Sequence, residues 1–314
     1  MRILHLDENH PLLIERLSEA GFHNITAYND PLEEIEHMLP LIGGLVIRSR
    51  IPIDRALLSH CKELKFIARV GAGLENIDQK QVDSLGIKLF SAPLGNANAV
   101  GEHALGMLLN LTNKLRPAHQ SIASGAWERE LHRGDELEGK TIGIIGYGNM
   151  GKSFAKKLKG FDIKEVIFVD IETKKPDEWA RQVALEELQE KAEVISLHTP
   201  ETPHTIGMID LEFIEKMKNP FWLINTARGS AVETAALVQA IKQGKVKGAA
   251  LDVLEYEKSS FENLFEKEDN QDLNFLLQAP NVLLSPHVAG WSIESHRKLA
   301  ELIVRQIVLN FKQL

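Results

Sequence analysis

The chain has 314 residues, of which 44% are hydrophobic and 25% charged, and its formal net charge at pH 7 is -8. At about 150 residues per domain this length predicts two domains, and the composition excludes a disordered or fibrous chain. The acidic excess argues against binding to nucleic acid or to an anionic membrane. A single cysteine, Cys61, excludes an intrachain disulfide. The amino terminus has no signal-peptide core and no apolar run could span a bilayer, so we expect a cytoplasmic protein.

In the first third of the chain, short apolar segments alternate with longer amphipathic ones. The expected strands are residues 3–6, 45–47, 66–68 and 87–90, and residues 11–20 are expected to form a helix. A long helix is expected from about 100 to 114. The polar segment 116–140 after it is expected to be a connection rather than a core element.

A second series of strands begins at residue 141. Its expected members are residues 141–145, 166–169, 194–197, 221–224, 248–253 and 282–284, and a last amphipathic helix is expected at about 293–312. The alternation of strands and helices predicts α/β domains in which helices cover both faces of a parallel sheet. Residues 255–272 carry seven acidic residues and two lysines. This pattern predicts a solvated surface loop, and a mobile flap beside a site is the alternative.

A glycine-rich turn follows the strand expected at 141–145. In its sequence, GYGNMG at 146–151, the glycines allow a tight turn, a close approach to a pyrophosphate and close packing of the next helix. The amino terminus of that helix offers free N–H groups to an anion. Asp170 ends the next strand, 19 residues after Gly151, where a ribose-binding carboxylate is expected. The pattern predicts an NAD site at which Asp170 repels NADP, with Lys174 and Lys175 as surface lysines; an ordinary strand–helix turn is the alternative.

Polar residues follow the remaining strands of this series. Because ligands bind beyond the carboxyl ends of parallel strands, we expect Arg228, a carboxylate after residue 252 and His287 to converge beside the cofactor. A histidine suits the proton that leaves an alcohol during oxidation, a glutamate can orient it, and an arginine can hold a neighbouring carboxylate. No metal-ligand spacing is present, so no metal is expected. His103 is expected to be structural, and a structural salt bridge between arginine and glutamate remains the alternative.

Together these segments resemble the D-isomer-specific 2-hydroxyacid dehydrogenases over nearly the whole chain. The resemblance rests on residues 96–103, 138–141 with the glycine turn, 197–200, 225–229, 250–253 and 285–290, in family order. It implies catalytic roles for Arg228, Glu257 and His287, with Glu257 preferred to Glu255 because it lies five residues after Asp252. The cofactor-binding residues it implies are Gly146, Tyr147, Gly148, Asn149, Met150, Gly151, Asp170, His198, Thr199, Pro200, Thr205, Thr226, Ala227, Asp252 and Gly290.

The resemblance also implies the architecture and the partners. It implies a flavodoxin-like substrate domain at 1–98, completed by 290–314, and a Rossmann-type NAD-binding domain at 99–289, with the site in the cleft. The expected cofactor is NAD, and the expected assembly is a homodimer joined through the NAD-binding domains and the segment around Trp127.

The segment Arg48-Ser49-Arg50 bears on the substrate. Within the family it resembles a basic segment of members that act on 3-phosphoglycerate, and two guanidinium groups suit a phosphate. Val70, Gly71 and Ala72 are expected to aim N–H groups at the substrate carboxylate. The alternatives are an unphosphorylated acid such as glycerate, hydroxypyruvate or lactate, and a non-enzymatic NAD-sensing scaffold. A pair of surface arginines is the structural alternative.

Overall fold

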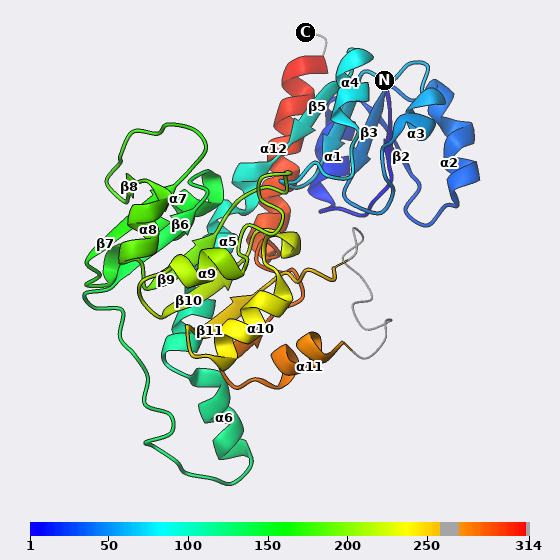
Figure 1. Cartoon of the computed structure of the whole chain (residues 1–314). Coiled ribbons are helices and arrows are strands. Elements are labelled where there is room, and N and C mark those ends of the chain that lie inside the picture. Colours follow the sequence, from blue (N-terminus) through cyan, green and yellow to red (C-terminus); the bar gives the residue numbers. More distant parts are fainter. Residues whose placement is uncertain (258–269, 312–314) are drawn as a thin grey trace. The chain divides into compact units, whose positions relative to one another are not determined.

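The computed structural model describes residues 1–257 and 270–311 (Figure 1). The chain divides into two compact units, residues 1–96 with 291–314, and residues 97–290. The sequence had placed these boundaries at 98 and 290. Each unit is built on its own parallel sheet, so the fold is α/β with two doubly wound domains. Among the described residues, no helix is both long and apolar enough to cross a bilayer.

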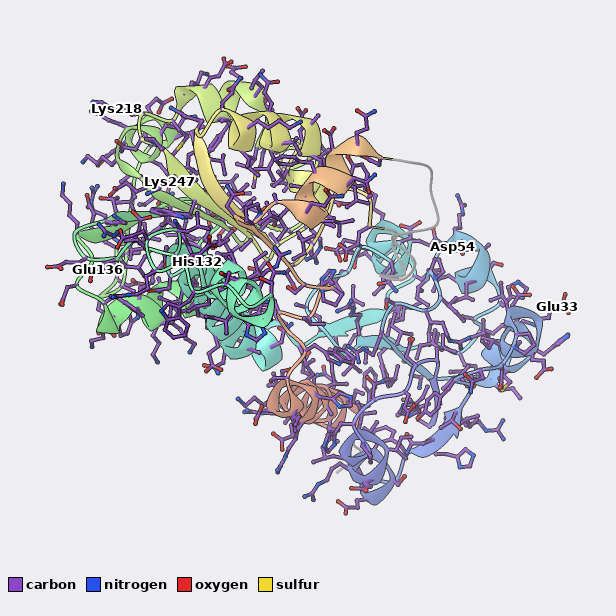
Figure 2. All side chains as sticks on the ribbon, turned by 90° about the horizontal axis from the view of Figure 1, so that it is seen from below. Glu33, Asp54, His132, Glu136, Lys218 and Lys247 are labelled. Atoms are coloured by element: carbon purple, nitrogen blue, oxygen red, sulfur yellow. The ribbon has the colours of Figure 1, made fainter. Side chains whose placement is uncertain are left out.

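Unit 1 contains a five-stranded sheet in the order β2-β1-β3-β4-β5, which is the flavodoxin-like order. Its strands are β1 (Arg2–His5), β2 (His23–Thr26), β3 (Gly44–Ile47), β4 (Phe66–Arg69) and β5 (Lys88–Ser91). Its helices are α1 (Leu12–Glu19), α2 (Leu32–Met38), α3 (Arg55–Ser59), α4 (Gln79–Ser84) and α12 (Ile293–Phe311), with a 3-10 turn η1 (Leu39–Leu41). Figure 2 shows Asp54 at the start of α3, where its carboxylate accepts the N–H of Leu57 at 2.9 Å and caps the helix.

Alternating residues of the buried strands pack into two hydrophobic cores, one on each face of the sheet in unit 1. Ile3 and Phe66 pack with Leu13 of α1 and Ile303 of α12 on one face, whereas the neighbouring Leu4 lies in the core of the opposite face. This period of two is that of a strand buried on both sides. The last helix of the chain therefore completes the hydrophobic core of the first unit.

Unit 2 contains a seven-stranded sheet in the order β12-β11-β10-β9-β6-β7-β8, all parallel, which is the Rossmann order. Its strands are β6 (Thr141–Ile145), β7 (Glu165–Val169), β8 (Arg181–Gln182), β9 (Val194–Leu197), β10 (Phe221–Asn225), β11 (Val246–Leu251) and β12 (Val282–Leu284). Its helices are α5 (Pro93–Thr112, which begins in the sequence of unit 1), α6 (Leu115–Ala123), α7 (Asn149–Lys157), α8 (Leu185–Lys191), α9 (Leu211–Lys216), α10 (Thr234–Lys242) and α11 (Gln271–Gln278), with 3-10 turns η2 (Leu158–Gly160) and η3 (Gly229–Ala231).

Three features differ from the sequence-based expectation. The segment 116–140 is not only a connection, because α6 lies at its start, and α5 begins seven residues before the expected position. None of the nine residues of α6 is buried, and its apolar residues Leu115 and Ile122 lie at the surface. The strands β2 and β8 were not expected; each lies at a sheet edge and has no fully buried residue. Most of the acidic segment expected as a loop or flap lies outside the described residues.

Candidate active site

The glycine-rich turn lies where the order of the seven-stranded sheet reverses, since β6 has β7 on one side and β9 on the other. Gly146 has a φ of +89°, and a Cβ atom there would lie 2.8 Å from the carbonyl oxygen of His198. Only glycine fits both conditions. A Cβ at Gly148 would meet no atom within 4 Å, so the turn leaves open space at the amino terminus of α7. The first-turn residues Asn149 and Met150 place their N–H groups beside that space.

Among the described residues, three buried polar atoms near the carboxyl ends of neighbouring strands have no hydrogen-bond partner. They are Nδ1 of His198 and the hydroxyl oxygens of Thr199 and Thr226, at the ends of β9 and β10. Leaving such atoms unpaired is costly, so their presence beside an open helix terminus fits a polar, anionic ligand such as a dinucleotide. His198 itself bonds Ser196 Oγ through Nε2 at 2.8 Å, and burial lowers its pKa to about 3, so the ring is neutral at physiological pH.

Asp170 follows β7 and accepts three hydrogen bonds. Its Oδ2 accepts the N–H of Tyr147 and the ammonium of Lys174, each at 2.7 Å, and its Oδ1 accepts the N–H of Glu172 at 3.0 Å. Partial burial alone would raise the pKa of Asp170, but these bonds and the charge of Lys174 outweigh it and lower the pKa. The expectation that Lys174 is a plain surface lysine is therefore wrong: its side chain is only 23% exposed and is bonded to Asp170.

Two residues that were expected to contact the cofactor, Tyr147 and Thr205, form hydrogen bonds within the protein. The ring of Tyr147 is 1% exposed, stacks on Phe168 with centroids 3.9 Å apart, and donates its hydroxyl to Asp177 at 2.9 Å. Burial and then Asp177 raise the pKa of this phenol. Because its N–H also donates to Asp170, Tyr147 supports the turn, and its expected contact with the cofactor stays a prediction. Thr205 likewise holds its own loop, donating to the carbonyl of Pro200 and accepting the N–H of Thr202, both at 2.8 Å.

His287 lies in the loop after β12 and pairs with Glu257. Its Nδ1 is 3.0 Å from Glu257 Oε1, and both side chains are mostly buried. The backbone of His287 has a φ of +54°, which is uncommon for a residue with a side chain and typical of functional sites. Glu255 is not its partner, because the Glu255 carboxylate accepts the N–H of Thr234 at the start of α10.

Asp252 holds the backbone around His287. Its carbonyl accepts the N–H of His287 at 2.7 Å, and its two carboxylate oxygens accept the N–H groups of Val288 and Ala289 at 2.9 and 2.8 Å. Asp252 is 1% exposed and also accepts the hydroxyl of Ser285 at 2.6 Å. The Asp252 carboxylate thus positions the loop that carries His287, and its expected contact with the cofactor stays a prediction.

His103 belongs to the same network, which the sequence did not indicate. Its Nε2 lies 3.0 Å from Ser285 Oγ and 3.5 Å from Asp252 Oδ1, so α5 is tied to the loop that carries His287. The expectation that His103 only supports its helix is thus too narrow. Its 182-residue separation from Ser285 hides the contact in the sequence.

Arg228 follows β10 in a turn held by the buried Asn225. The Asn225 amide donates to the carbonyl of Arg228 at 2.9 Å, and its oxygen accepts the N–H of Ala227 at 3.0 Å. The next residue, Gly229, packs so closely that a Cβ would lie 1.9 Å from the carbonyl oxygen of Leu254. The turn with Arg228 therefore rests on the segment that leads to Glu257, and all three expected catalytic residues belong to unit 2.

The two arginines of the basic segment in unit 1 have different environments. The guanidinium of Arg48 lies 3.9 Å from the ring centroid of Trp291. Burial and then Arg69 lower its pKa to about 10, against the effect of Asp7, so it stays charged at neutral pH. Arg50 instead donates to backbone carbonyls of Leu6, Ala27 and Asp30 at 2.9, 2.6 and 3.3 Å. Arg50 therefore has three backbone partners that Arg48 lacks, and the expected pairing of both arginines on one anion stays a prediction.

Two of the three N–H groups at 70–72 that were expected to bind the substrate carboxylate already donate to backbone carbonyls. The N–H of Val70 donates to Ile47 and that of Gly71 to Arg69, both at 2.9 Å. Arg69, which the sequence did not single out, ends β4 with its guanidinium against Gly71. Arg69 lies close enough to Arg48 for the two positive charges to repel each other, and the expected cradle of N–H groups stays a prediction.

Comparison with known proteins places the chain in a family. The sequence signature of the D-isomer specific 2-hydroxyacid dehydrogenase NAD binding domain matches residues 105–289. A D-3-phosphoglycerate dehydrogenase of Archaeoglobus fulgidus is 36% identical over 88% of this chain, which spans 51% of that relative, about half its length. A hydroxypyruvate reductase of Thermotoga maritima is 34% identical over 92% of this chain and 90% of the relative.

Solved structures of the same family are also similar to this chain. A crystal structure of D-lactate dehydrogenase from Aquifex aeolicus, complexed with NAD and lactic acid, superposes with a TM-score of 0.83 at 27% identity, covering 99% of this chain and 96% of that one. The chain therefore belongs to the NAD-dependent D-isomer-specific 2-hydroxyacid dehydrogenases, and its seven-stranded unit is the NAD-binding domain.

Proposed function

We propose that this dehydrogenase interconverts 3-phosphoglycerate and 3-phosphohydroxypyruvate, the reaction that leads to serine. One observation carries the proposal: unit 1 holds a charged guanidinium, Arg48, stacked on Trp291 and next to Arg69. Within the described part of the chain, no carboxylate forms an ion pair with Arg48. Two neighbouring positive charges with one uncommitted guanidinium suit a doubly charged phosphate on the substrate.

In this proposal the reacting carbon lies beside unit 2. His287 exchanges the proton of the C2 hydroxyl, and Glu257 fixes the orientation of the ring and stabilises its charged form. Arg228 holds the substrate carboxylate and polarises the C2 oxygen. NAD, when bound, supplies the acceptor for the hydride. The residues that would hold it are the turn at 146–151, Asp170, and the unpartnered atoms of His198, Thr199 and Thr226.

A second candidate is the reduction of an unphosphorylated acid such as hydroxypyruvate. It is favoured by the commitment of Arg50 to three carbonyl oxygens, which leaves one arginine of the expected pair for an anion. The hydroxypyruvate reductase of Thermotoga maritima, which matches along 90% of its length, supports the same alternative.

The experiment is a comparison of turnover with NADH. Initial rates are measured with 3-phosphohydroxypyruvate, hydroxypyruvate, glyoxylate and pyruvate. The proposal expects kcat/KM to be highest for the phosphorylated acid by about tenfold or more, the scale of one charged hydrogen bond. Equal values for phosphohydroxypyruvate and hydroxypyruvate would favour the second candidate, and no turnover with any acid would favour a scaffold that only binds NAD.

We also propose that the protein is a homodimer joined through α6 and the loop after it. Figure 1 shows this part of unit 2 standing apart from the seven-stranded sheet. It carries the large apolar side chains of Leu115, Ile122 and Leu131, all more than half exposed, and Trp127, which is 79% exposed. A cluster of this kind is typical of a subunit interface. Sedimentation equilibrium of the protein and of Trp127→Ser tests this, with dissociation expected for the variant.

A further inference from the structure

The Lys174 side chain bears on which dinucleotides the NAD-binding domain accepts. Its Nζ lies 2.7 Å from Asp170 Oδ2 and 3.2 Å from the carbonyl oxygen of Tyr147, at the edge of the glycine-rich turn. A third oxygen, on the well-exposed Glu172, is 3.7 Å away and contributes little. A positive charge is therefore held where the adenosine ribose of a dinucleotide is expected to bind.

The hydrogen bonds of Asp170 set a limit on ribose binding. A carboxylate oxygen has two lone-pair positions. Oδ2 already accepts two bonds, from Tyr147 and Lys174, whereas Oδ1 accepts one, from Glu172. The diol of an NAD ribose brings two donors. With Lys174 in place, Asp170 has room for one of them, so accepting both requires Nζ to leave Oδ2.

A 2′-phosphate changes the balance. It brings about two negative charges and no need for an acceptor, so it is repelled by an isolated carboxylate and attracted by an ammonium group. Lys174 offsets the charge of Asp170 and offers its donors at the same place. Its stem is mostly buried and Nζ keeps the Tyr147 carbonyl as an anchor, so only a short rotation separates the two arrangements.

We propose that Lys174 forms a subsite for the 2′-phosphate of the adenosine ribose, so that the domain binds NADP as well as NAD. Asp170 remains the ligand for the NAD ribose, and NAD remains the tighter ligand because Asp170 keeps its negative charge. Lys174 sets how large the difference between the two cofactors is. This inference concerns the cofactor alone and does not depend on the proposed substrate.

The test uses adenosine fragments that cannot react. Binding of adenosine 2′,5′-bisphosphate and of 5′-AMP to the full-length protein is measured by titration calorimetry. Lys174→Met removes the charge and keeps the apolar stem. Lys175→Met is the matched control, because Lys175 is the exposed neighbour and forms no ion pair with any described residue. The unaltered protein is expected to bind both fragments.

In Lys174→Met the affinity for the bisphosphate is expected to fall about tenfold or more, the scale of one charged hydrogen bond. The affinity for 5′-AMP stays the same or rises, because a competitor for Asp170 is gone, and this retained binding shows that the variant is folded. Undetectable bisphosphate binding by the unaltered protein, equal losses for both fragments, or an equal loss in Lys175→Met would overturn the inference.

Discussion

Nδ1 of His287 lies 3.0 Å from Oε1 of Glu257, a residue 30 positions earlier in the chain. The contact arises because β11 and β12 are neighbouring parallel strands, and the loops after them leave the sheet at the same edge. Asp252, in the first of these loops, binds the backbone of the second and fixes His287 in its left-handed conformation. The backbone beside His287 is therefore held by hydrogen bonds to the neighbouring loop.

Replacing His287 with alanine is expected to lower kcat by about 10²–10⁴, the usual scale for a lost general acid or base. Glu257→Gln keeps the hydrogen bond to the ring and removes the negative charge, so kcat is expected to fall while NADH binding is unchanged. Glu255→Gln is the control, since Glu255 bonds the start of α10. A loss of kcat in Glu255→Gln and none in Glu257→Gln would contradict the assignment.

Arg228→Lys is expected to lower kcat/KM by about 10²-fold or more although the charge is kept. A lysine has no planar fork and cannot bind a carboxylate through two parallel bonds. The turn that carries residue 228 depends on the backbone contacts of Asn225, so it should survive the change. Steady-state kinetics with a 2-oxo acid measure the effect, and unchanged NADH binding is the control. Near-normal turnover in Arg228→Lys would remove Arg228 from the proposed site.

The protein is expected to lose stability as the pH falls from about 6.5 toward 3. Burial lowers the pKa of His198 to about 3, so the unfolded chain takes up a proton near pH 6.5 that the folded chain does not. The stabilising contribution of neutral His198 is thus complete above pH 6.5 and declines below it. Burial lowers the pKa of His5 as well, with the same sign.

Urea unfolding without cofactor at a series of pH values checks this. In His198→Gln the free energy of unfolding should depend less steeply on pH between 6.5 and 4, by up to about 1.4 kcal/mol per pH unit. His23→Gln is the control, because His23 is exposed. Parallel pH dependences for the unaltered protein and His198→Gln would show that another group carries the acid sensitivity.

The sequence predicted the strands that are buried on both faces. The strands β6 and β9 agree at both ends, because buried parallel strands appear as short apolar runs between polar turns. The edge strand β12 also agrees at both ends, although only Val282 of its residues is buried. The edge strand β2 and the helix α6 were missed because neither buries a residue. The conformation of β2 comes from backbone pairing with β1, and the apolar residues of α6 lie at the surface rather than in the core.

Some residues of the candidate site could be predicted from the sequence and others could not. Asp170, Arg228 and His287 were identifiable because each follows a strand of one parallel sheet, so topology alone brings them to one edge. The bond of Lys174 to Asp170 and the link from His103 to Ser285 depend on where long side chains end, which spacing does not reveal. The different environments of Arg48 and Arg50 could not be predicted for the same reason. The two arginines are only two residues apart, but one packs on the Trp291 ring and the other bonds carbonyl oxygens.

These two arginines provide a matched pair for testing the phosphate site. Arg48 is charged and uncommitted to any described carboxylate, so Arg48→Ala is expected to raise KM for 3-phosphohydroxypyruvate by about 10–100-fold, the effect of losing one charged hydrogen bond. KM for hydroxypyruvate, which has no phosphate, should change little.

Arg50→Ala should leave the ratio of the two KM values unchanged and lower the free energy of unfolding by about 1–3 kcal/mol, because three carbonyl oxygens lose their donor. If Arg48→Ala affects both substrates equally, Arg48 supports the fold and the unphosphorylated acid becomes the better candidate. If Arg50→Ala selectively weakens the phosphorylated substrate, Arg50 must release its carbonyl partners when substrate binds, and the phosphate site includes both arginines.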